Sequence, residues 1–459
     1  MRTKYFRQAM LFLFHRRFSE SEWSSYGKLR NRDKTTRLTI RWGMVIALVV
    51  SVPILGFGFP GEGVHIGDAV LSPFAEFSAE HDSNVLLSPT NKETDVFTEL
   101  EAGLQLHYEP GYFTLDGRAF ALSRRYTRYG SMGFENAGEQ MTFMTGSRDV
   151  ASVSISESYR QINDYDRSTY YGDTLNPESQ NLSLAYDESI RVRRTLEDVG
   201  VNLGRQLTDK TDVSLGFNYG AQNYDSNRLF NVESLVAQGG ISYRVTDKSS
   251  IMLAGQYGME DNASFAKDST FVAIQGGVDT KSTDKMTLKA SAGVERYSRD
   301  ATVSYNQSVS DFQGSIYTGP RQSDEQVLTL NLAATWIATD KITLEASGLT
   351  GIESAQQYVN TLNQIAVATA NAVYQVSDSI TMALTGSYRE DKYLDPVIED
   401  NIQYNRVDNR IAGLIRADYR QPTEFLSIFI EAGLEKATST VPDFNYDQLR
   451  IGLGISARY

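Results

Sequence analysis

The sequence predicts an all-β protein: a transmembrane, antiparallel, up-and-down β-barrel of about eighteen strands, with sixteen as the main alternative. Three observations lead to this prediction. Residues 449–459 place an apolar side chain at every odd position and Arg, Gly or Ser at every even one, and they end on Tyr459. Such alternation gives a β-strand one apolar face. Near-identical short turns recur along the chain, and no stretch beyond residue 60 shows the 3.6-residue apolar period of a helix.

The composition agrees with a barrel and excludes several other classes. The 459 residues include 26 Tyr and 35 Gly, but only 10 Pro and no Cys. Mean hydropathy is -0.35, which is too low for a bundle of membrane helices and suits strands that are polar on one face. The lack of Cys excludes a disulfide framework, thiol catalysis and a lipid-modified N-terminal Cys.

The charge is divided unevenly. The whole chain carries a net charge of -13, whereas residues 1–42 carry +8, so the remainder carries -21. An acidic body of this size predicts no nucleic-acid partner. Acidic loops that keep the barrel soluble at its rims explain the charge most simply, and a lumen that disfavours anions or a surface facing divalent cations are the alternatives.

The N-terminal residues are set apart from the barrel. Residues 44–59 form the one long apolar run, which Pro53 interrupts and which follows the basic Arg37 and Arg41. This order predicts a secretory signal peptide with an unusually long basic region, cleaved near 56–63, and a retained anchor helix is the alternative. We therefore divide the chain into an N-terminal extension plus signal peptide, residues 1–60, and an outer-membrane barrel, residues 61–459.

From about Val70 onward, alternating strand patterns follow one another, as in residues 213–222, 328–336 and 426–435. An even number of strands returns the last strand to the side where the first began. Residues 61–459 allow about 22 residues for each strand and its connection, which suits spanning strands of about 10 residues. The expected strands are 69–82, 94–108, 112–126, 136–146, 150–162, 194–207, 212–225, 233–245, 250–263, 269–281, 286–299, 325–338, 342–355, 361–376, 380–393, 406–420, 425–438 and 446–459.

The connections are of two kinds, which predict a periplasmic rim of short turns and an extracellular rim of long, acidic loops. The short ones form an internal repeat whose unit is one β-hairpin. We expect the Asp of each turn to bond the backbone two residues later. The repeated turns are Thr208-Asp209-Lys210, Thr246-Asp247-Lys248, Thr283-Asp284-Lys285 and Thr339-Asp340-Lys341, with Ser377-Asp378-Ser379 as a variant. The expected long loops are 83–93, 127–135, 163–193, 226–232, 264–268, 300–324, 356–360, 394–405 and 439–445.

Aromatic residues gather near the expected strand ends, as they do where a barrel meets the two lipid headgroup regions. A soluble β-sandwich is the alternative, but eighteen one-faced strands would need a further apolar surface to cover them. A closed barrel also leaves no unpaired sheet edge in lipid. The group beside the short turns is Tyr108, Tyr112, Tyr243, Trp336, Tyr374, Tyr419 and Tyr459, and the group nearer the long loops is Tyr219, Tyr257, Tyr297 and Tyr388.

Catalytic and metal-binding patterns are weak. Beyond the targeting segment, His65, His81 and His107 are scattered, without the spacing of a zinc site. His107 has the phase of a polar lumen residue rather than of a hydrolase triad on the outer wall. The loop residues Asp164, Asp166 and Asp173 offer oxygen ligands but not the spacing of an EF-hand. We expect no enzyme activity, no cofactor and no metal site.

Charged residues that alternate with apolar ones are expected on the lumen face of the barrel. Their mixed signs would keep the interior wet, and rings of charge set ion preference in pores. Acidic members slightly outnumber basic ones, which predicts a weak cation preference, and a static network that fills the interior is the alternative. The candidate lumen charges are Asp198, Arg244, Asp279, Lys289, Glu295, Glu345, Arg389, Arg416, Asp418, Glu431 and Glu435.

The sequence resembles the β-barrel porin 2 family and related outer-membrane proteins found with exopolysaccharide gene clusters. The matching features are Glu80-His81-Asp82-Ser83-Asn84-Val85 after the first strand, the repeated Thr-Asp-Lys hairpins and the C-terminal Tyr459. The resemblance covers roughly residues 68–459. It implies a bacterial outer-membrane barrel whose C-terminal aromatic is a sorting signal, with a role in polysaccharide or solute passage. The long N-terminal extension departs from the family.

Two functions follow from these expectations. The first is a porin-like channel for ions or small solutes in the outer membrane of a Gram-negative-type bacterium. The alternative is a component or accessory of exopolysaccharide or surface-polymer export. The expected partners are outer-membrane lipid, the barrel-insertion machinery acting on the C-terminal strand, and polysaccharide or small solutes, with no nucleic acid.

Overall fold

A computed structural model describes ten segments of the chain, and all that follows concerns these segments. The predicted signal peptide, the acidic residues Asp164, Asp166 and Asp173, and most of the expected long loops lie outside them. The described segments are residues 63–147, 151–162, 193–224, 231–262, 269–299, 323–354, 362–394, 397–399, 402–421 and 425–459.

The described residues form a closed antiparallel β-barrel of eighteen strands, which confirms the predicted fold class and strand number. All the strand ends agree with the expected ends to within two residues, because the sequence changes sharply from alternation to turn residues there. The strands of the wall are β2 Ala69–Asp82, β3 Asp95–Tyr108, β4 Phe113–Tyr126, β5 Phe134–Ser147, β6 Ala151–Ile162, β7 Arg194–Thr208, β8 Thr211–Tyr224, β9 Val232–Thr246, β10 Ser249–Asn262, β11 Ser269–Thr283, β12 Met286–Arg299, β13 Ser323–Thr339, β14 Ile342–Ser354, β15 Leu362–Ser377, β16 Ile380–Tyr393, β19 Val407–Arg420, β20 Leu426–Ser439 and β21 Tyr446–Arg458.

A few short elements complete the described chain. β1, Val64–Ile66, pairs with the start of β2, and a small hairpin joins β17, Val397–Glu399, to β18, Ile402–Tyr404. Two single 3-10 turns, η2 Gly130–Met132 and η4 Pro442–Phe444, lie in the connections after β4 and β20. The described part of the chain holds no helix with the length and hydropathy to cross a bilayer.

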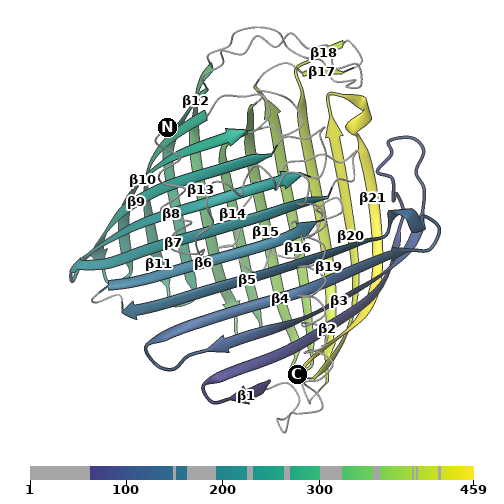
Figure 1. Cartoon of the computed structure of the whole chain (residues 1–459), viewed down its shortest axis with the longest axis horizontal. Helices are drawn as coiled ribbons and strands as arrows, with labels where there is room; N and C mark the ends of the chain where they lie inside the picture. Colours follow the sequence, from purple (N-terminus) through teal and green to yellow (C-terminus); the bar gives the residue numbers. More distant parts are fainter. Residues whose placement is uncertain are drawn as a thin grey trace, which may run out of the picture. The chain divides into compact units, whose positions relative to one another are not determined.

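The barrel closes where its first and last wall strands pair. β2 and β21 run antiparallel from Phe74 opposite Arg458 to Asp82 opposite Arg450. Figure 1 shows the yellow C-terminal strands standing beside the purple β2, whereas every other wall strand pairs with its neighbours in sequence. Closure leaves no sheet edge with unpaired backbone groups, which is the requirement for strands in lipid.

The Asp-Ser-Asn element of the sequence lies on this seam, at the rim of the long loops. The Ser83 N–H donates to the Leu449 carbonyl at 3.0 Å, and the Leu449 N–H donates to Ser83 Oγ at 2.8 Å. Asn84 is fully buried; its side-chain amide donates to the Asp447 carbonyl and accepts from the Ser88 N–H. These bonds extend the β2–β21 ladder beyond the strands, so the element fastens the seam.

The repeated turns form two-residue reversals after β7, β9, β11, β13 and β15, but the predicted role of their Asp is wrong. The hydroxyl of the Thr accepts the bond from the backbone N–H two residues later, at 3.2 Å from Lys341 N to Thr339 Oγ1. Thr208, Thr246 and Thr283 make the same bond. The Asp instead projects into solvent, where Asp340 lies 3.4 Å from Lys285 of the preceding turn. The hydroxyl precedes the reversal and can reach across it, whereas the Asp side chain points outward.

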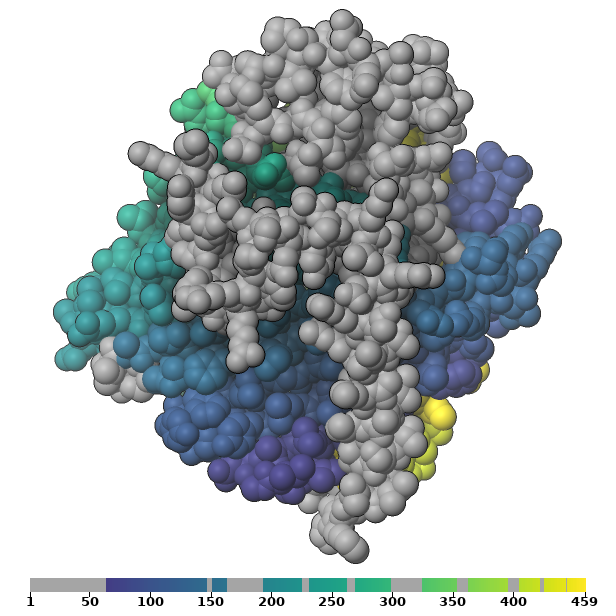
Figure 2. Space-filling view, in the orientation of Figure 1, coloured from purple at the N-terminus to yellow at the C-terminus, as the bar shows by residue number. Residues whose placement is uncertain are grey.

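The outward face of the wall is apolar. On β13, Leu328, Leu330, Leu332 and Trp336 are exposed, and they alternate with polar or small residues on the inner face. The same holds for β10, β16, β19, β20 and β21. The first strands, coloured purple to teal, form the near wall in Figure 2. An exposed apolar band around a closed barrel is the surface that acyl chains solvate.

Most of the expected aromatic belt residues lie on this outward face, and one does not. Tyr243, Trp336, Tyr374 and Tyr419 are exposed at the rim of the short turns. Tyr297, by contrast, is only 2% exposed. It faces inward on β12, donates or accepts a hydrogen bond with Ser269, and packs with Ile352 and Leu362. Its placement in the belt is therefore wrong, because Tyr297 has the inward phase of Lys289 and Glu295 on the same strand and packs in a small core there.

Candidate functional site

The inner face of the wall carries the polar and charged residues. The predicted lumen charges lie at strand positions that alternate with exposed apolar residues, and the structure brings some of them together and leaves others apart. Arg416 is the centre of one cluster. Its guanidinium lies 3.1 Å from Asp418, 3.5 Å from Glu431 and 3.6 Å from Glu76.

Other predicted charges pair in smaller groups. Lys289 lies 3.7 Å from Asp279 on the neighbouring strand, and Glu435 lies 3.3 Å from Arg410. Arg389 forms a salt bridge with Asp391 through more than one N–H group, with a shortest N–O distance of 2.6 Å.

The remaining predicted charges stand apart from these groups. Glu295 is buried and its carboxylate accepts from the Ile352 N–H at 3.4 Å. Asp198 lies 3.5 Å from the Ser158 hydroxyl. Arg244 and Glu345 make no ion pair with other described residues.

Sequence reasoning missed the charged and aromatic residues of the first three wall strands. Arg118 on β4 donates to Glu101 on β3 at 2.8 Å, and its guanidinium lies over the rings of Phe74 and Phe120 at 5.0 and 5.4 Å. Arg124 likewise pairs with Glu99 and stacks on Phe97. On each of these strands, alternation already assigns these residues to the inner face: Glu76 with Phe74, Glu101, and Arg118 with Phe120. The sequence pattern could therefore have identified them as lumen residues.

Inward phenylalanines cover inward glycines on the adjacent strand. Phe271 packs over Gly258, and Phe429 packs over Gly454, where a Cβ would collide with the ring. Phe429 also lies 3.7 Å beneath the Arg416 guanidinium. A glycine lets the ring lie flat on the sheet, and the flat ring then supports the charge above it. The same arrangement recurs at Phe74 over Gly103 and Phe120 over Gly138.

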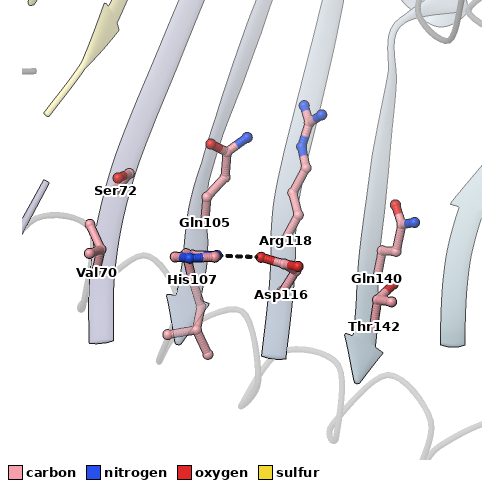
Figure 3. Close-up of a pocket in the computed structure, with 10 residues that line it drawn as sticks. Val70, Ser72, Gln105, His107, Asp116, Arg118, Gln140 and Thr142 are labelled. Carbon is pink, nitrogen blue, oxygen red and sulfur yellow. Dashed lines mark hydrogen bonds and ion pairs between the residues drawn. The ribbon is translucent and has the colours of Figure 1, made fainter. Parts of the chain in front are cut away.

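A cavity of about 310 Å³ lies on the inner face of β2–β5, close to the rim of short turns. Figure 3 shows its lining, in which the His107 ring faces Asp116 at 2.7 Å. Glu109, in the adjoining turn, lies 3.6 Å from the same ring. The lining residues are Val70, Ser72, Gln105, Leu106, His107, Asp116, Gly117, Arg118, Gln140 and Thr142.

Within the described segments no group of three or more His, Asp or Glu residues is placed to hold a metal ion. The His107 and Asp116 pair has the orientation of a base and its orienting carboxylate. Ser72 stands on the next strand but makes no hydrogen bond to His107, so the described residues provide no nucleophile for this pair.

Among known proteins, the chain is similar only to β-barrels of solved structure. No family model matches the chain, and no curated protein matches it. OpdQ of Pseudomonas aeruginosa aligns with 86% of this chain and 99% of its own, at 13% identity and a TM-score of 0.43. OpdK of the same organism, solved with vanillate, aligns with 88% and 100% at 10% identity and 0.42. The FrpB iron transporter of Neisseria meningitidis aligns with 84% and 81% at 8% identity and 0.41. Likeness at this level assigns neither a family nor a function.

Proposed function

We propose that this chain is a channel of the outer membrane of a Gram-negative-type bacterium and passes ions and small polar solutes. The observation that carries the proposal is the closed wall of eighteen strands, apolar outside and lined inside with hydroxyls, amides and ion pairs. Barrels of sixteen to eighteen strands are wide enough to leave an aqueous channel. Transport rather than catalysis is the role that such a lining supports.

Single-channel recording of the refolded full barrel in a planar bilayer tests this proposal. We expect stable, voltage-tolerant conductance steps. A purified, folded barrel that inserts and gives no steps would contradict the channel function.

The lumen charges favour a weak cation preference. Glu76 and Glu431 both face Arg416, which also pairs with Asp418, so this cluster holds more carboxylates than guanidinium groups. In a salt gradient the reversal potential should therefore indicate cation preference, and Glu76→Gln with Glu431→Gln should reduce it. Clear anion selectivity of the unaltered channel would reject this part of the proposal.

The expected partners and the family belong to the same proposal. The outward apolar band supports outer-membrane lipid as the surrounding medium, and we further propose that the barrel-insertion machinery acts on β21, the strand that closes the barrel against β2. Tyr459 packs edge-on against Phe425, and its N–H donates to the Pro73 carbonyl at 3.0 Å. We also propose that the chain belongs to the β-barrel porin 2 family. The Asp-Ser-Asn element supports this proposal, because it holds β2 and β21 together where the barrel closes.

A further inference from the structure

We infer that the cavity on β2–β5 is a binding site for a neutral polyhydroxylated solute, such as a sugar ring. This inference rests on the proposed channel function, because the cavity opens on the inner face of the wall. Its volume of about 310 Å³ is at the lower end of the range of about 300–1,000 Å³ found for small-molecule pockets.

The register of four strands builds the site as two rows. Ser72 stands opposite Gln105, Gln105 opposite Arg118, and Arg118 opposite Gln140. One step nearer the rim, His107 stands opposite Asp116, and Asp116 opposite Thr142. Adjacent strands are about 4.8 Å apart, so the first row presents four polar side chains at regular spacing over about 14 Å. Figure 3 shows these side chains side by side on their strands.

The charges in these rows are already compensated. Arg118 is bonded to Glu101 at 2.8 Å and is held over the Phe74 and Phe120 rings. Asp116 is bonded to His107 at 2.7 Å. Glu109 also lies 3.6 Å from the His107 ring, so an added anion would meet carboxylates here, and an added ion of either sign would compete with the existing ion pairs. The site therefore favours a neutral ligand.

The remaining polar groups are available to a ligand. Among the described residues, no hydrogen-bond partner within the protein is found for the side chains of Ser72, Gln105, Gln140 and Thr142. Some amides elsewhere on the inner face are already engaged within the protein. Gln275, for example, bonds Ser291, Thr329 and Asn331.

The available groups match the chemistry of a polyol. An amide presents donors and an acceptor together, and a hydroxyl can do both. A polyol carries hydroxyls that also donate and accept. Each of the two amides and two hydroxyls can therefore either donate a hydrogen bond to the polyol or accept one from it. Arg118 keeps further N–H groups beyond the one that it gives to Glu101, and these can only donate.

Solute-induced block of single-channel current tests the assignment, with glucose as the probe. Glucuronate and glucosamine carry the same ring with a negative or a positive charge. We expect glucose to interrupt the current in a saturable, concentration-dependent manner and more effectively than either charged analogue. The double variant Gln105→Ala, Gln140→Ala should raise the half-blocking glucose concentration at least fivefold. Gln375→Ala removes a lumen glutamine at the same rim but outside the cavity, and it should leave the block unchanged.

The outcomes separate this inference from the channel proposal. Conductance steps that glucose never blocks saturably, or that glucuronate or glucosamine blocks better, would overturn the polyol site and leave the channel intact. Equal loss of block in the Gln375→Ala control would also overturn it. If the barrel gives no conductance, the channel proposal fails. Saturation-transfer NMR of glucose with the folded barrel in detergent then tests the binding site independently of conductance. A transfer signal that the double variant abolishes supports the site, and absence of a signal overturns it.

Discussion

At the scale of single residues, the inner wall depends on close approach between aromatic rings and glycines. Phe271 lies so close to the Gly258 backbone that any Cβ there would collide with the ring. The ring also stacks on Tyr297 with a centroid separation of 6.1 Å, so it cannot move without disturbing the small core above it.

Gly258→Ala should therefore destabilise the barrel by about 1–3 kcal/mol, the usual cost of overpacking. Gly386→Ala is the matched control, because a Cβ at Gly386 meets nothing within 4 Å. Urea unfolding in lipid vesicles measures both. The double variant Gly258→Ala, Phe271→Leu should recover part of the loss. Equal stability of the two single alanine variants would show that the ring adapts freely.

The fastening of the seam depends on another single side chain, that of Asn84. Its amide bonds both Ser88 and the Asp447 carbonyl while fully buried, so truncation leaves buried backbone groups without partners. We expect Asn84→Ala to destabilise the barrel by about 1–3 kcal/mol. Asn91→Ala, on the same loop but exposed, is the control. Thermal unfolding followed by the gel mobility of the folded form would test it, and unchanged stability would remove the fastening role from Asn84.

At the scale of strands, alternation in the sequence predicts most of the wall. It gives the number of strands, their approximate ends and the side to which each residue points, because period two is fixed by the pleat. It does not give the partner across a strand pair, which depends on the length of each turn. The rows of the cavity on β2–β5 need this register, since Gln105, Arg118 and Gln140 come together only when three strands are aligned. Tyr297 was misplaced for a different reason: it has the same inward phase as Lys289 and Glu295, and only its position near a strand end suggested the belt.

One group of strands departs from the apolar band. On β5, β6 and β7 the outward positions include Glu139, Glu157 and Glu197, all exposed. Glu157 stands between Met141 and Val199 on its two neighbours, and it has no ion-pair partner among the described residues. A carboxylate on the lipid face is unfavourable within the band.

Removal of this carboxylate should stabilise the barrel. We expect Glu157→Leu to raise the free energy of unfolding in lipid by about 1–2 kcal/mol. Asp340→Leu, in a solvent-exposed turn at the rim, should give no comparable gain. Unfolding in vesicles compares the two. A loss of stability on Glu157→Leu would indicate that the carboxylate contacts something other than acyl chains.

At the scale of the whole barrel, the parts agree with one another. The wall closes between β2 and β21, the short turns are joined by Lys–Asp contacts around one rim, and small aromatic cores stiffen the strand ends at the other. The inner face then carries charge clusters held over rings, together with the polar cavity. All of these depend on one condition, which is that the outward apolar half of each strand is solvated by lipid.

Site-directed spin labelling along β13 tests this condition most directly. The chain has no Cys, so single cysteines at positions 328 to 336 can be labelled one at a time in the unaltered background. In liposomes, we expect labels at Leu328, Leu330, Leu332, Ala334 and Trp336 to be accessible to oxygen, and labels at the intervening positions to be accessible to a water-soluble nickel complex. Accessibility that follows period two in opposite phases supports the account, and uniform access to the water-soluble reagent along the strand would contradict it.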